Sequence, residues 1–330
     1  TTEIYTLSLH DALPIYAEFD YTSSEHEWIE RIDELLDDAT RIRLRSDVPL
    51  GIFLSAGIDS GLVAAAAAKA VDNTAGLTSL TVSLPGWEKD EWPLASKVGR
   101  HLGLTAVHRE LDPESMKNLP ALAAHFDEPF SDHSMIPAFL ICKAARERMT
   151  VVLSGDGGDE LFAGYQNHLR AYRYRTLERI PAPVRTLMAA LGRSVTRPDS
   201  APRRFLNRLP QPAGFYGLGA KVYLFEEWLQ ELIKKEFYFP DRTLLRASRQ
   251  RYGECISSHA LDTAQRHDMR LYLLDDVLVK VDRMSMLNSL EVRSPLLDYR
   301  LVELALKIPP DLRTRNGWNK YLLRRLAEKK

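Results

Sequence analysis

The chain has 330 residues, of which 45% are hydrophobic and 27% charged, a balance typical of a globular protein with one large domain or two small ones. Its formal net charge of −1 argues against a dedicated nucleic-acid-binding protein. The two cysteines, Cys142 and Cys255, exclude a disulfide framework and favour a reducing, cytoplasmic location. The apolar run at 62–68 is far shorter than the roughly 18 residues of a membrane span, so no membrane association is expected.

Both ends of the chain look non-native in sequence. Residues 1–15, TTEIYTLSLHDALPI, have no initiator methionine and resemble translated sequencing-adapter read-through. We therefore expect a non-native leader there and one domain over residues 16–330. The helical pattern at 320–330 stops without the Gly, Asn or Pro that commonly ends a helix, which predicts a domain truncated at its C-terminus.

Predicted helices and strands alternate from residue 25 onward. An apolar stripe predicts a helix over Glu25–Leu44, and short apolar or β-branched runs predict strands. The predicted strands are 49–55, 77–83, 105–111 and 150–154, and the further predicted helices are 61–71, 91–102, 113–125, 134–148, 255–264, 269–281, 285–293 and 320–330. Because each parallel strand needs a crossover to return the chain, this order predicts an α/β fold. We expect a parallel sheet with helices on both faces, followed by a helical C-terminal part.

The first predicted strand runs into small residues, Ser55-Ala-Gly-Ile-Asp-Ser60, and then into an alanine-rich helix. At such a turn, backbone N–H groups and the positive end of the helix dipole point at one place where an anion can bind. Asp59 is suitably placed to hold the Mg²⁺ that accompanies a nucleoside triphosphate. Two interpretations stay open from this segment alone, a phosphate-binding loop or an ordinary turn capped by Ser60.

The strand at 150–154 leads into a second loop of this kind, Ser154-Gly-Asp-Gly-Gly-Asp-Glu160. The ends of two strands in one parallel sheet can open on the same crevice, where open α/β sheets bind ligands. Helix capping explains one carboxylate at this place. Three carboxylates in five positions exceed what one cap needs, which favours a functional site with Asp156 and Asp159 near the phosphates.

Four motifs together carry a family resemblance. They are LSAGIDS at 54–60, VLSGDGGDELFAGY at 152–165, VKVDRMSMLNSLEVRSPLLD at 279–298 and NKYLLR at 319–324. In this order they resemble the ATP-dependent synthetase domain of the glutamine-hydrolysing asparagine synthetases, over roughly residues 25–330. The resemblance implies a fold of the adenine nucleotide alpha hydrolase-like, PP-loop ATP pyrophosphatase type, with ATP and Mg²⁺ as cofactors.

The resemblance also implies roles for single positions. The nucleotide-binding residues that it implies are Ser55, Gly57, Asp59, Ser60, Val82, Ser154, Gly155 and Tyr165. The implied Mg²⁺ ligands are Asp59 and Asp159, and the implied catalytic residues are Asp156, Arg293 and Lys320. Lys320 matches a lysine that contacts phosphate during adenylation. Ala56 stands where many family members have glycine, so the backbone there should avoid a conformation that only glycine permits.

The implied reaction is amidation of aspartate to asparagine with ATP, through an acyl-adenylate, with release of AMP and pyrophosphate. The nitrogen is ammonia, which a glutaminase domain that this sequence lacks would supply from glutamine. The full-length protein is expected to form a homodimer. Two alternatives stay open: an amide-forming enzyme that adenylates another carboxylate, and a nucleotide-binding protein without catalysis.

Overall fold

The computed structural model describes residues 18–83, 90–111, 117, 119–128, 130–197, 200–210, 253 and 255–330. Contacts within the chain divide it into two compact units. The first comprises Thr1–Phe162, Arg270–Pro309 and Tyr321–Lys330, and the second comprises Ala163–Met269 and Pro310–Lys320. The prediction of one domain over residues 16–330 stays a prediction, and the leader at 1–15 lies outside the described residues.

The first unit contains a five-stranded parallel sheet. Its strands are β1 (Leu50–Phe53), β2 (Thr78–Ser83), β3 (Thr105–Glu110), β4 (Val151–Leu153) and β5 (Glu291–Arg293), in the spatial order β3-β2-β1-β4-β5. In β1, Gly51 is aligned with Thr78 of β2 and with Val152 of β4. The chain runs outward from β1 to β3 and then returns to the other side of β1. The topological switch point therefore lies between β1 and β4.

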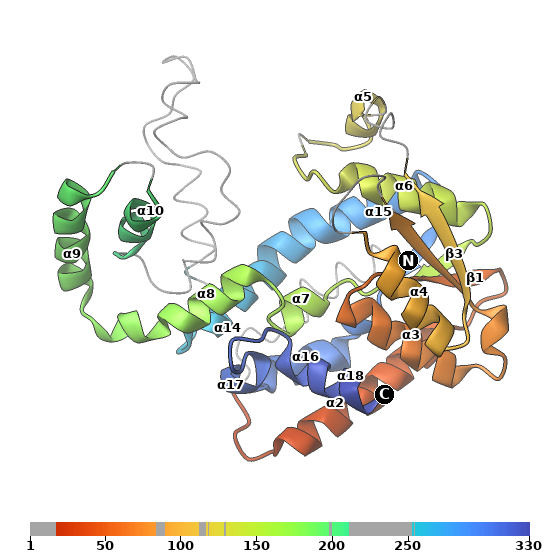
Figure 1. Ribbon diagram of the computed structural model, residues 1–330, viewed down its shortest axis with the longest axis horizontal. Coiled ribbons are helices and arrows are strands. Elements are labelled where there is room, and N and C mark those ends of the chain that lie inside the picture. The colour runs from red at the N-terminus through yellow and green to blue at the C-terminus, as the bar shows by residue number, and fades with distance from the viewer. Residues whose placement is uncertain are drawn as a thin grey trace. The chain divides into compact units, whose positions relative to one another are not determined.

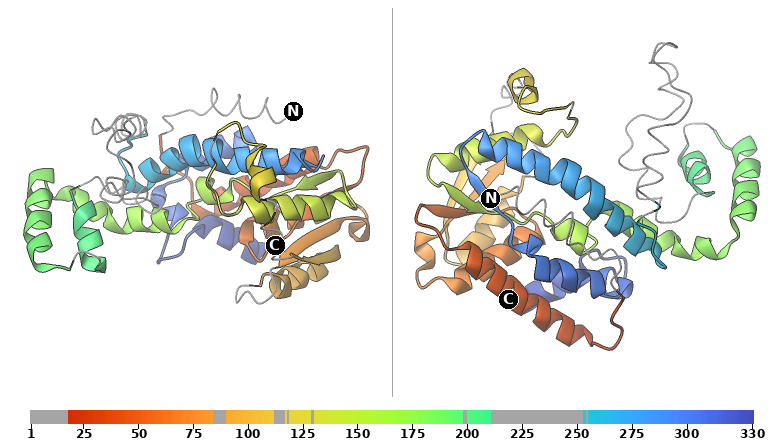
Figure 2. Two further views of the ribbon diagram at one scale, coloured as in Figure 1. Left: turned by 90° about the horizontal axis from the view of Figure 1, so that it is seen from above. Right: turned by 180° about the vertical axis from the view of Figure 1, so that it is seen from behind.

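Helices cover both faces of this sheet (Figures 1 and 2). α3 (Ile58–Ala70) and α4 (Trp92–His101) follow β1 and β2, and α6 (Met135–Arg146) precedes β4. Because right-handed crossovers that run in opposite directions along a sheet place their helices on opposite faces, α6 lies across the sheet from α3 and α4. The predicted α/β fold with helices on both faces is thus confirmed.

The core under α6 follows from the alternation of side chains along the strands. Leu80 of β2 and Val152 of β4 are buried against Cys142 and Ala145 of α6. Cys142 is thus a small core residue, and burial raises the pKa of its thiol to about 12. Such a thiol stays protonated and unreactive at neutral pH.

α2 (Glu25–Arg43) confirms the first predicted helix. Ser24 accepts a hydrogen bond from the Glu27 N–H while the Glu27 side chain accepts one from the Ser24 N–H, a capping box that fixes where the helix begins. Trp28, Ile32 and Leu36 form its buried stripe at four-residue spacing. α2 packs against α3 and against α18 (Tyr321–Lys329), the helix predicted over 320–330.

The predicted helix over 285–293 is wrong in its second half. α15 (Val279–Met286) ends at Met286, and Ser289 adopts a left-handed φ of +53°, which interrupts a helix. Residues Glu291–Arg293 instead form the edge strand β5, which pairs with β4. The four predicted strands are present, and this fifth strand was not predicted.

Other predicted helices differ in extent. α14 (Ala260–His267) begins five residues later than the helix predicted over 255–264. The helix predicted over 269–281 is a π-helical segment, η4 (Asp268–Leu278), that leads into α15. Of the helix predicted over 113–125, the structure shows α5 (Leu119–Ala123), and part of the rest lies outside the described residues.

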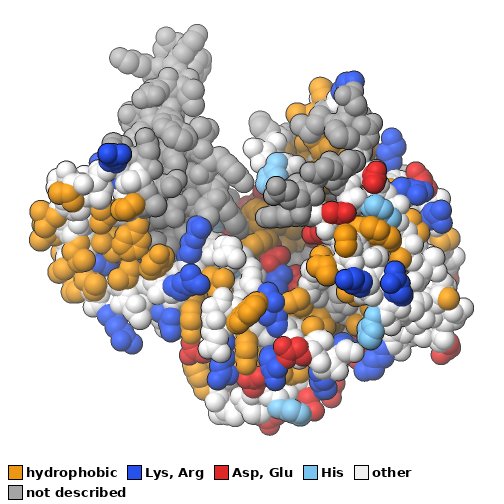
Figure 3. Space-filling view, in the orientation of Figure 1, with side chains coloured by type: hydrophobic (Ala, Val, Ile, Leu, Met, Phe, Trp, Pro, Cys, Tyr) orange, Lys and Arg blue, Asp and Glu red, His pale blue; other side chains and the backbone are white. Residues whose placement is uncertain are grey.

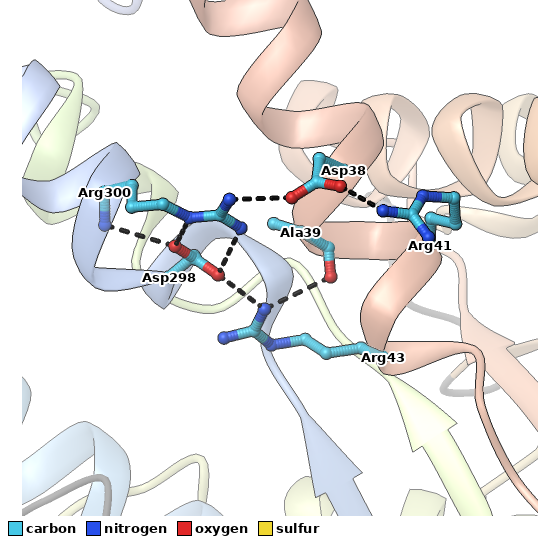
Figure 4. Close-up of polar contacts among 6 residues, drawn as sticks. All are labelled: Asp38, Ala39, Arg41, Arg43, Asp298 and Arg300. Atoms are coloured by element: carbon cyan, nitrogen blue, oxygen red, sulfur yellow. Dashed lines mark hydrogen bonds and ion pairs between the residues drawn. The ribbon is translucent and has the colours of Figure 1, made fainter.

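A short segment, Ser294–Asp298, joins β5 to α16 (Tyr299–Lys307) and is called the strap below; it includes the turn η5 (Pro295–Leu297). Its last residue is held by an ion-pair network (Figure 4). Asp298 accepts hydrogen bonds from Arg43 Nη1 at 2.9 Å and Arg300 Nε at 2.9 Å, and it caps α16 by accepting from the Arg300 N–H. Arg300 also donates to Asp38 at 2.7 Å. Burial alone raises the pKa of Asp298, but these hydrogen bonds lower it overall.

The second unit is helical in the residues that the structure describes. It contains α8 (Gln166–Tyr174), η3 (Arg175–Arg179), α9 (Ala182–Val195), α10 (Ala201–Arg208), α14 and α17 (Pro310–Arg313). α8 packs on α14 around buried polar groups, where Asp268 accepts from Asn167 Nδ2 at 3.0 Å and contacts His168 Nε2 at 2.9 Å. This network satisfies charges that would otherwise be costly to bury.

α9 carries an exposed apolar stripe (Figure 3). Val184, Leu187, Leu191 and Val195 are spaced by three or four residues and are 46%, 60%, 64% and 83% exposed. On another side of the helix, Arg185 is buried and donates to the backbone carbonyls of Ile180 and Leu209. No helix among the described residues is long and apolar enough to cross a membrane.

The ion-pair network gives a stability prediction. We expect Asp298→Ala to lower the free energy of unfolding by about 3–5 kcal/mol, because it leaves the buried Arg43 without its carboxylate. Asp38→Ala is the matched control, since Asp38 is 31% exposed, and it should cost about 1 kcal/mol or less. Urea denaturation of the three proteins measures both values. Equal losses for the two variants would contradict the assigned role of Asp298.

Candidate functional site

The loop after β1 is shaped by its two serines. Ser55 Oγ lies 2.8 Å from Ser60 Oγ, the Ser55 N–H donates to Ser60 Oγ at 3.1 Å, and the Gly57 N–H donates to Ser55 Oγ at 3.0 Å. Gly57 is the N-cap of α3, which has no side-chain cap. The alternative in which Ser60 caps the helix is therefore wrong. The first-turn N–H groups of α3 have no acceptor within the helix, so they form a natural binding place for an anion.

The loop after β4 is hydrogen-bonded to the end of β5, directly before the strap. The Ser154 N–H donates to the Arg293 carbonyl at 2.9 Å, and Ser154 Oγ donates to Asp156 Oδ2 at 2.7 Å. Gly157, with a φ of +91°, precedes the single turn α7 (Gly158–Leu161). A methyl group on Gly157 would lie 2.2 Å from Leu297 Cδ2, so this position needs glycine for both space and backbone conformation.

The two loops touch through glycines. A methyl group on Gly155 would lie 2.7 Å from the backbone N of Ser60, and one on Gly158 would lie 2.4 Å from the carboxylate carbon of Asp59. Asp59 itself is buried. Asp59 of the first loop therefore packs against Gly158 of the second, beside the switch point, where open α/β sheets bind their ligands.

Asp156 lies in an electrostatic environment that favours its neutral form. Burial raises the pKa of its carboxyl, and the charge of Asp159 raises it further, while the hydrogen bond from Ser154 and the charge of Lys280 act in the opposite direction. Carboxyls with raised pKa values in clefts are frequent among catalytic groups. The catalytic role of Asp156 stays a prediction, and the direction of its pKa shift is compatible with it.

Lys280 links this region to the start of α6. Its Nζ donates to Asp132 Oδ2 at 2.5 Å and to Ser134 Oγ at 2.7 Å. Burial alone raises the pKa of Asp132, but the hydrogen bond from Lys280 and the other bonds to its carboxylate lower it to about 2. The charge of Lys280 also acts on Asp156, whose pKa it lowers against the larger effect of burial.

The first unit brings most of the predicted site residues to one edge of the sheet. Ser55, Gly57, Asp59 and Ser60 follow β1, while Ser154, Gly155, Asp156 and Asp159 follow β4. Val82 is the half-buried penultimate residue of β2, aligned with Arg109 of β3. Ala56 has a φ outside the left-handed region, as expected for an alanine in this loop.

Arg293, predicted as catalytic, has its guanidinium on protein acceptors. Its Nη1 donates to the carbonyls of Arg43 and Arg45 at 2.8 and 2.7 Å, and its Nε donates to Glu291 at 2.7 Å. These contacts tie the last strand of the sheet to the C-terminal end of α2. The structure thus supplies a structural task for this side chain, whereas its catalytic task stays a prediction.

Tyr165 and Lys320 belong to the second unit. Tyr165 is the N-cap residue of α8, and its ring centroid lies 5.4 Å from that of His168. Lys320 is buried, with a left-handed φ of +51°, next to Asn319, whose side chain donates to the Gly164 carbonyl.

Three residues near the loops were not predicted as site residues. Ser294 Oγ lies 2.9 Å from Ser154 Oγ, and Lys280 donates a hydrogen bond to Asp132. The Glu91 carboxylate accepts a hydrogen bond from the Ala56 N–H, although burial raises its pKa overall. Ser294 and Lys280 lie in the 279–298 motif, which was the available signal, but a serine or a lysine there has no pattern that points to its partner.

No group of three or more His, Cys, Asp or Glu side chains that could hold a metal ion by themselves occurs among the described residues. The predicted Mg²⁺ ligands fit a different arrangement. Magnesium is commonly held by one or two carboxylates together with substrate phosphates and water. Asp59 packs on the backbone of Gly158, and Asp159 is the next residue of that loop, so the two carboxylates as Mg²⁺ ligands stay a prediction.

The fold and the loop contact define a doubly wound α/β protein with its candidate site at the switch point. Residues 31–330 match the asparagine synthase family. The chain therefore belongs to that family.

Three relatives illustrate the match. The chain is 31% identical over 307 residues to asparagine synthetase [glutamine-hydrolyzing] 1 of Bacillus subtilis, an alignment that covers 93% of this chain and 48% of the relative. It is 30% identical to a putative asparagine synthetase [glutamine-hydrolyzing] of Mycobacterium bovis, over 91% of this chain and 45% of the relative. It is 26% identical to amidase chyE of Penicillium rubens, over 91% of this chain and 50% of the relative. The chain spans about half the length of these curated relatives.

Among solved structures, an NH3-dependent NAD synthetase from Campylobacter jejuni aligns with 59% of this chain and 97% of its own. The TM-score is 0.28 and the sequence identity 16%. At these values the alignment carries no argument about fold or function, and the fold class rests on the sheet itself.

The loop contact gives the second prediction. We expect Gly155→Ala to lower the free energy of unfolding by about 1–3 kcal/mol, because its methyl group meets the backbone of Ser60. Gly61→Ala is the matched control: nothing lies within 4 Å of its added methyl group, and alanine in a helix should stabilise by about 0.5–1 kcal/mol. Urea denaturation measures both variants. A Gly155→Ala protein as stable as the parent would contradict the close approach of the loops.

The pair of Lys280 and Asp132 gives a pH prediction. The folded pKa of Asp132, about 2, lies below its ordinary value of 3.8, so the pair stabilises the fold above pH 3.8 and loses this contribution as the pH falls towards 2. Asp132→Asn should therefore be less stable than the parent at pH 5, with the difference shrinking by roughly 1–2 kcal/mol at pH 2. Asp127→Asn, at a carboxylate that is 81% exposed, is the control and should show little change with pH. A difference for Asp132→Asn that stays constant with pH would contradict the ion pair.

Proposed function

We propose that this chain binds ATP at the switch point and activates the side-chain carboxylate of aspartate by adenylation, so that ammonia can convert it to asparagine. The observation that carries the proposal is the contact of two glycine-containing loops at the ends of β1 and β4, in a chain that belongs to the asparagine synthase family. Phosphate binding uses backbone N–H groups at a helix start, which the loop before α3 presents.

In this proposal the first loop grips the terminal phosphates. The serine pair Ser55 and Ser60 shapes the loop, and Gly57 allows a phosphate to approach the backbone. Val82, Ser154, Gly155 and Tyr165 are proposed to line the nucleotide. With the terminal phosphates held, the α-phosphorus remains open to attack, which suits a pyrophosphate-releasing enzyme.

Asp59 and Asp159 are proposed to hold Mg²⁺ together with the phosphates of bound ATP. When bound, the ion supplies positive charge that stabilises the leaving pyrophosphate. The burial of Asp59 and its contact with Gly158 keep one carboxylate fixed at the place where the phosphates would lie. Holding this group in place before the reaction avoids the cost of reorganising it during the reaction.

The proposed chemistry balances in two steps. A carboxylate oxygen of aspartate attacks the α-phosphorus, the bond from that phosphorus to the pyrophosphate oxygen breaks, and an acyl-adenylate forms. Ammonia then attacks the acyl carbon, AMP leaves with the bonding electron pair, and the amide nitrogen loses one proton. Asp156, with its raised pKa, is proposed to take up that proton. Lys320 is proposed to contact phosphate during the first step, and Arg293 is proposed to support the reacting groups.

The source of the ammonia lies outside the region matched here. Relatives whose names specify glutamine hydrolysis are about twice as long as the aligned region. We propose that a glutaminase domain delivers ammonia from glutamine to this domain, within a homodimer of the full-length protein.

A second candidate function is amide formation on a different carboxylate substrate. A relative named as an amidase, amidase chyE, aligns with 91% of this chain. Residues that bind ATP need not change when the substrate acid changes, because adenylation is the same reaction for any carboxylate. The substrate acid is therefore the point that separates the two candidates.

The test is exchange of labelled pyrophosphate into ATP by this chain. Exchange that requires aspartate supports the first candidate, exchange only with another acid supports the second, and ATP binding without exchange contradicts both. Asp59→Ala should lower the exchange rate by at least about 10³-fold if Asp59 holds the metal-bound phosphates. Asp72→Ala, at an exposed aspartate just beyond the other end of α3, is the control and should exchange at the parent's rate. Parental exchange by Asp59→Ala would overturn the metal role.

A further inference from the structure

We propose that Ser294 is a positioning residue for Asp156, acting through the hydroxyl of Ser154; this inference rests on the proposed function, in which Asp156 is the proton acceptor. Ser294 is the first residue after β5, and Ser154 is the first residue after β4. Because the two strands are parallel neighbours, their following residues meet at the same edge of the sheet.

The three side chains form a directed chain of hydrogen bonds. Ser154 Oγ donates to Asp156 Oδ2 at 2.7 Å and lies 2.9 Å from Ser294 Oγ. A serine hydroxyl has one proton, and Ser154 uses it for Asp156. The proton between the two serines therefore belongs to Ser294, so the chain runs from Ser294 to Ser154 to Asp156. Each bond in such a chain polarises and strengthens the next.

Ser294 can hold this chain of hydrogen bonds in place because the strap, to which it belongs, is anchored at both ends. Directly before the strap, the Arg293 carbonyl accepts a hydrogen bond from the Ser154 N–H, and the Arg293 side chain donates to the carbonyls of Arg43 and Arg45. At its end, Asp298 is bound by Arg43 and Arg300 (Figure 4). Ser294 thus lies between two anchored positions, Arg293 and Asp298.

The middle of the strap makes a second contact with the same loop. Leu297 is buried and lies against Gly157, at a distance that leaves no room for a side chain there. Leu297 limits the position of the loop backbone, and Ser294 limits the rotation of the Ser154 hydroxyl. Together they leave the Asp156 carboxylate one favoured orientation at the switch point.

Without the Ser294 hydroxyl, Ser154 keeps its backbone position but its hydroxyl is free to rotate towards other acceptors. The Asp156 carboxylate then loses a steady donor on Oδ2. A misplacement of a catalytic group by about 1 Å lowers a rate by up to about 10²-fold, whereas binding of the nucleotide phosphates elsewhere in the site is unaffected. The expected signature is a loss of kcat for amide formation from ammonia without a change in the KM for ATP, while pyrophosphate exchange, which ends at the adenylate, keeps the parent's rate.

The test compares Ser294→Ala, which removes the hydroxyl, with Ser294→Thr, which keeps it. Crystal structures of both variants show the orientation of Asp156, and amide formation from aspartate, ATP and ammonia gives kcat and the KM for ATP. Ser294→Ala should turn the Ser154 hydroxyl away from Asp156 and lower kcat by roughly 10- to 100-fold at an unchanged KM. Ser294→Thr should retain both the orientation and most of the rate.

Two controls separate positioning from general destabilisation. Ser285→Ala removes a buried hydroxyl that donates to the Asp282 carbonyl within α15, and it should leave the rate of amide formation and the orientation of Asp156 unchanged. In an Asp156→Asn background, Ser294→Ala should lower the rate little further, because residues that act as one unit are not additive.

The outcomes decide the inference independently of the proposed function. Parental kcat and an unmoved Asp156 in Ser294→Ala would overturn the inference. A rise in the KM for ATP with kcat unchanged would also overturn it. If the parent shows no exchange with any acid, the proposed function fails, and the two crystal structures still determine whether Ser294 orients Asp156.

Discussion

The contact between the loops after β1 and β4 is the constraint on which the rest of the site depends. Gly155 and Gly158 let one backbone approach Ser60 and Asp59 to distances that no side chain would allow. This contact is possible only where two parallel neighbours are followed by chains that leave in different directions, which is the switch point of the sheet. The sheet order places the two loops side by side, and the glycines let them touch.

The sequence predicted the parts of the fold that have a strong local signal. The four predicted strands are apolar or β-branched runs, and α2 shows an uninterrupted helical stripe ending in basic residues. β5 escaped prediction because Glu291-Val-Arg293 is three residues long, half-buried and charged at both ends, so it has no periodicity of its own. Its pairing with β4 and the left-handed Ser289 determine its structure, and neither can be derived from local sequence.

For the candidate site, local sequence likewise indicates the two loops but not the contacts that support them, and the roles of its residues stay predictions. The two loops are continuous in sequence and carry glycines and carboxylates, so their residue types indicate anion and metal chemistry directly. The supporting contacts are long-range: Ser294 reaches Ser154 across 140 residues, and Lys280 reaches Asp132 across 148. A serine or lysine has many possible partners, and only the folded sheet selects one. Arg293 illustrates the converse case, since its motif suggested the site while its guanidinium bonds backbone carbonyls beside α2.

The strap explains why a buried ion pair is present in a part of the fold that carries no predicted catalytic group. Burying Arg43 and Asp298 costs desolvation energy that their attraction only partly offsets, so apolar residues of similar size would stabilise the fold as well or better. An apolar contact, however, tolerates sliding, whereas two arginines that converge on one carboxylate determine where the strap ends. The fixed end of the strap sets the positions of Leu297 and Ser294, and their contacts with Gly157 and Ser154 set the position of the loop that carries Asp156. The buried charges therefore contribute to the geometry of the site more than to the stability of the fold.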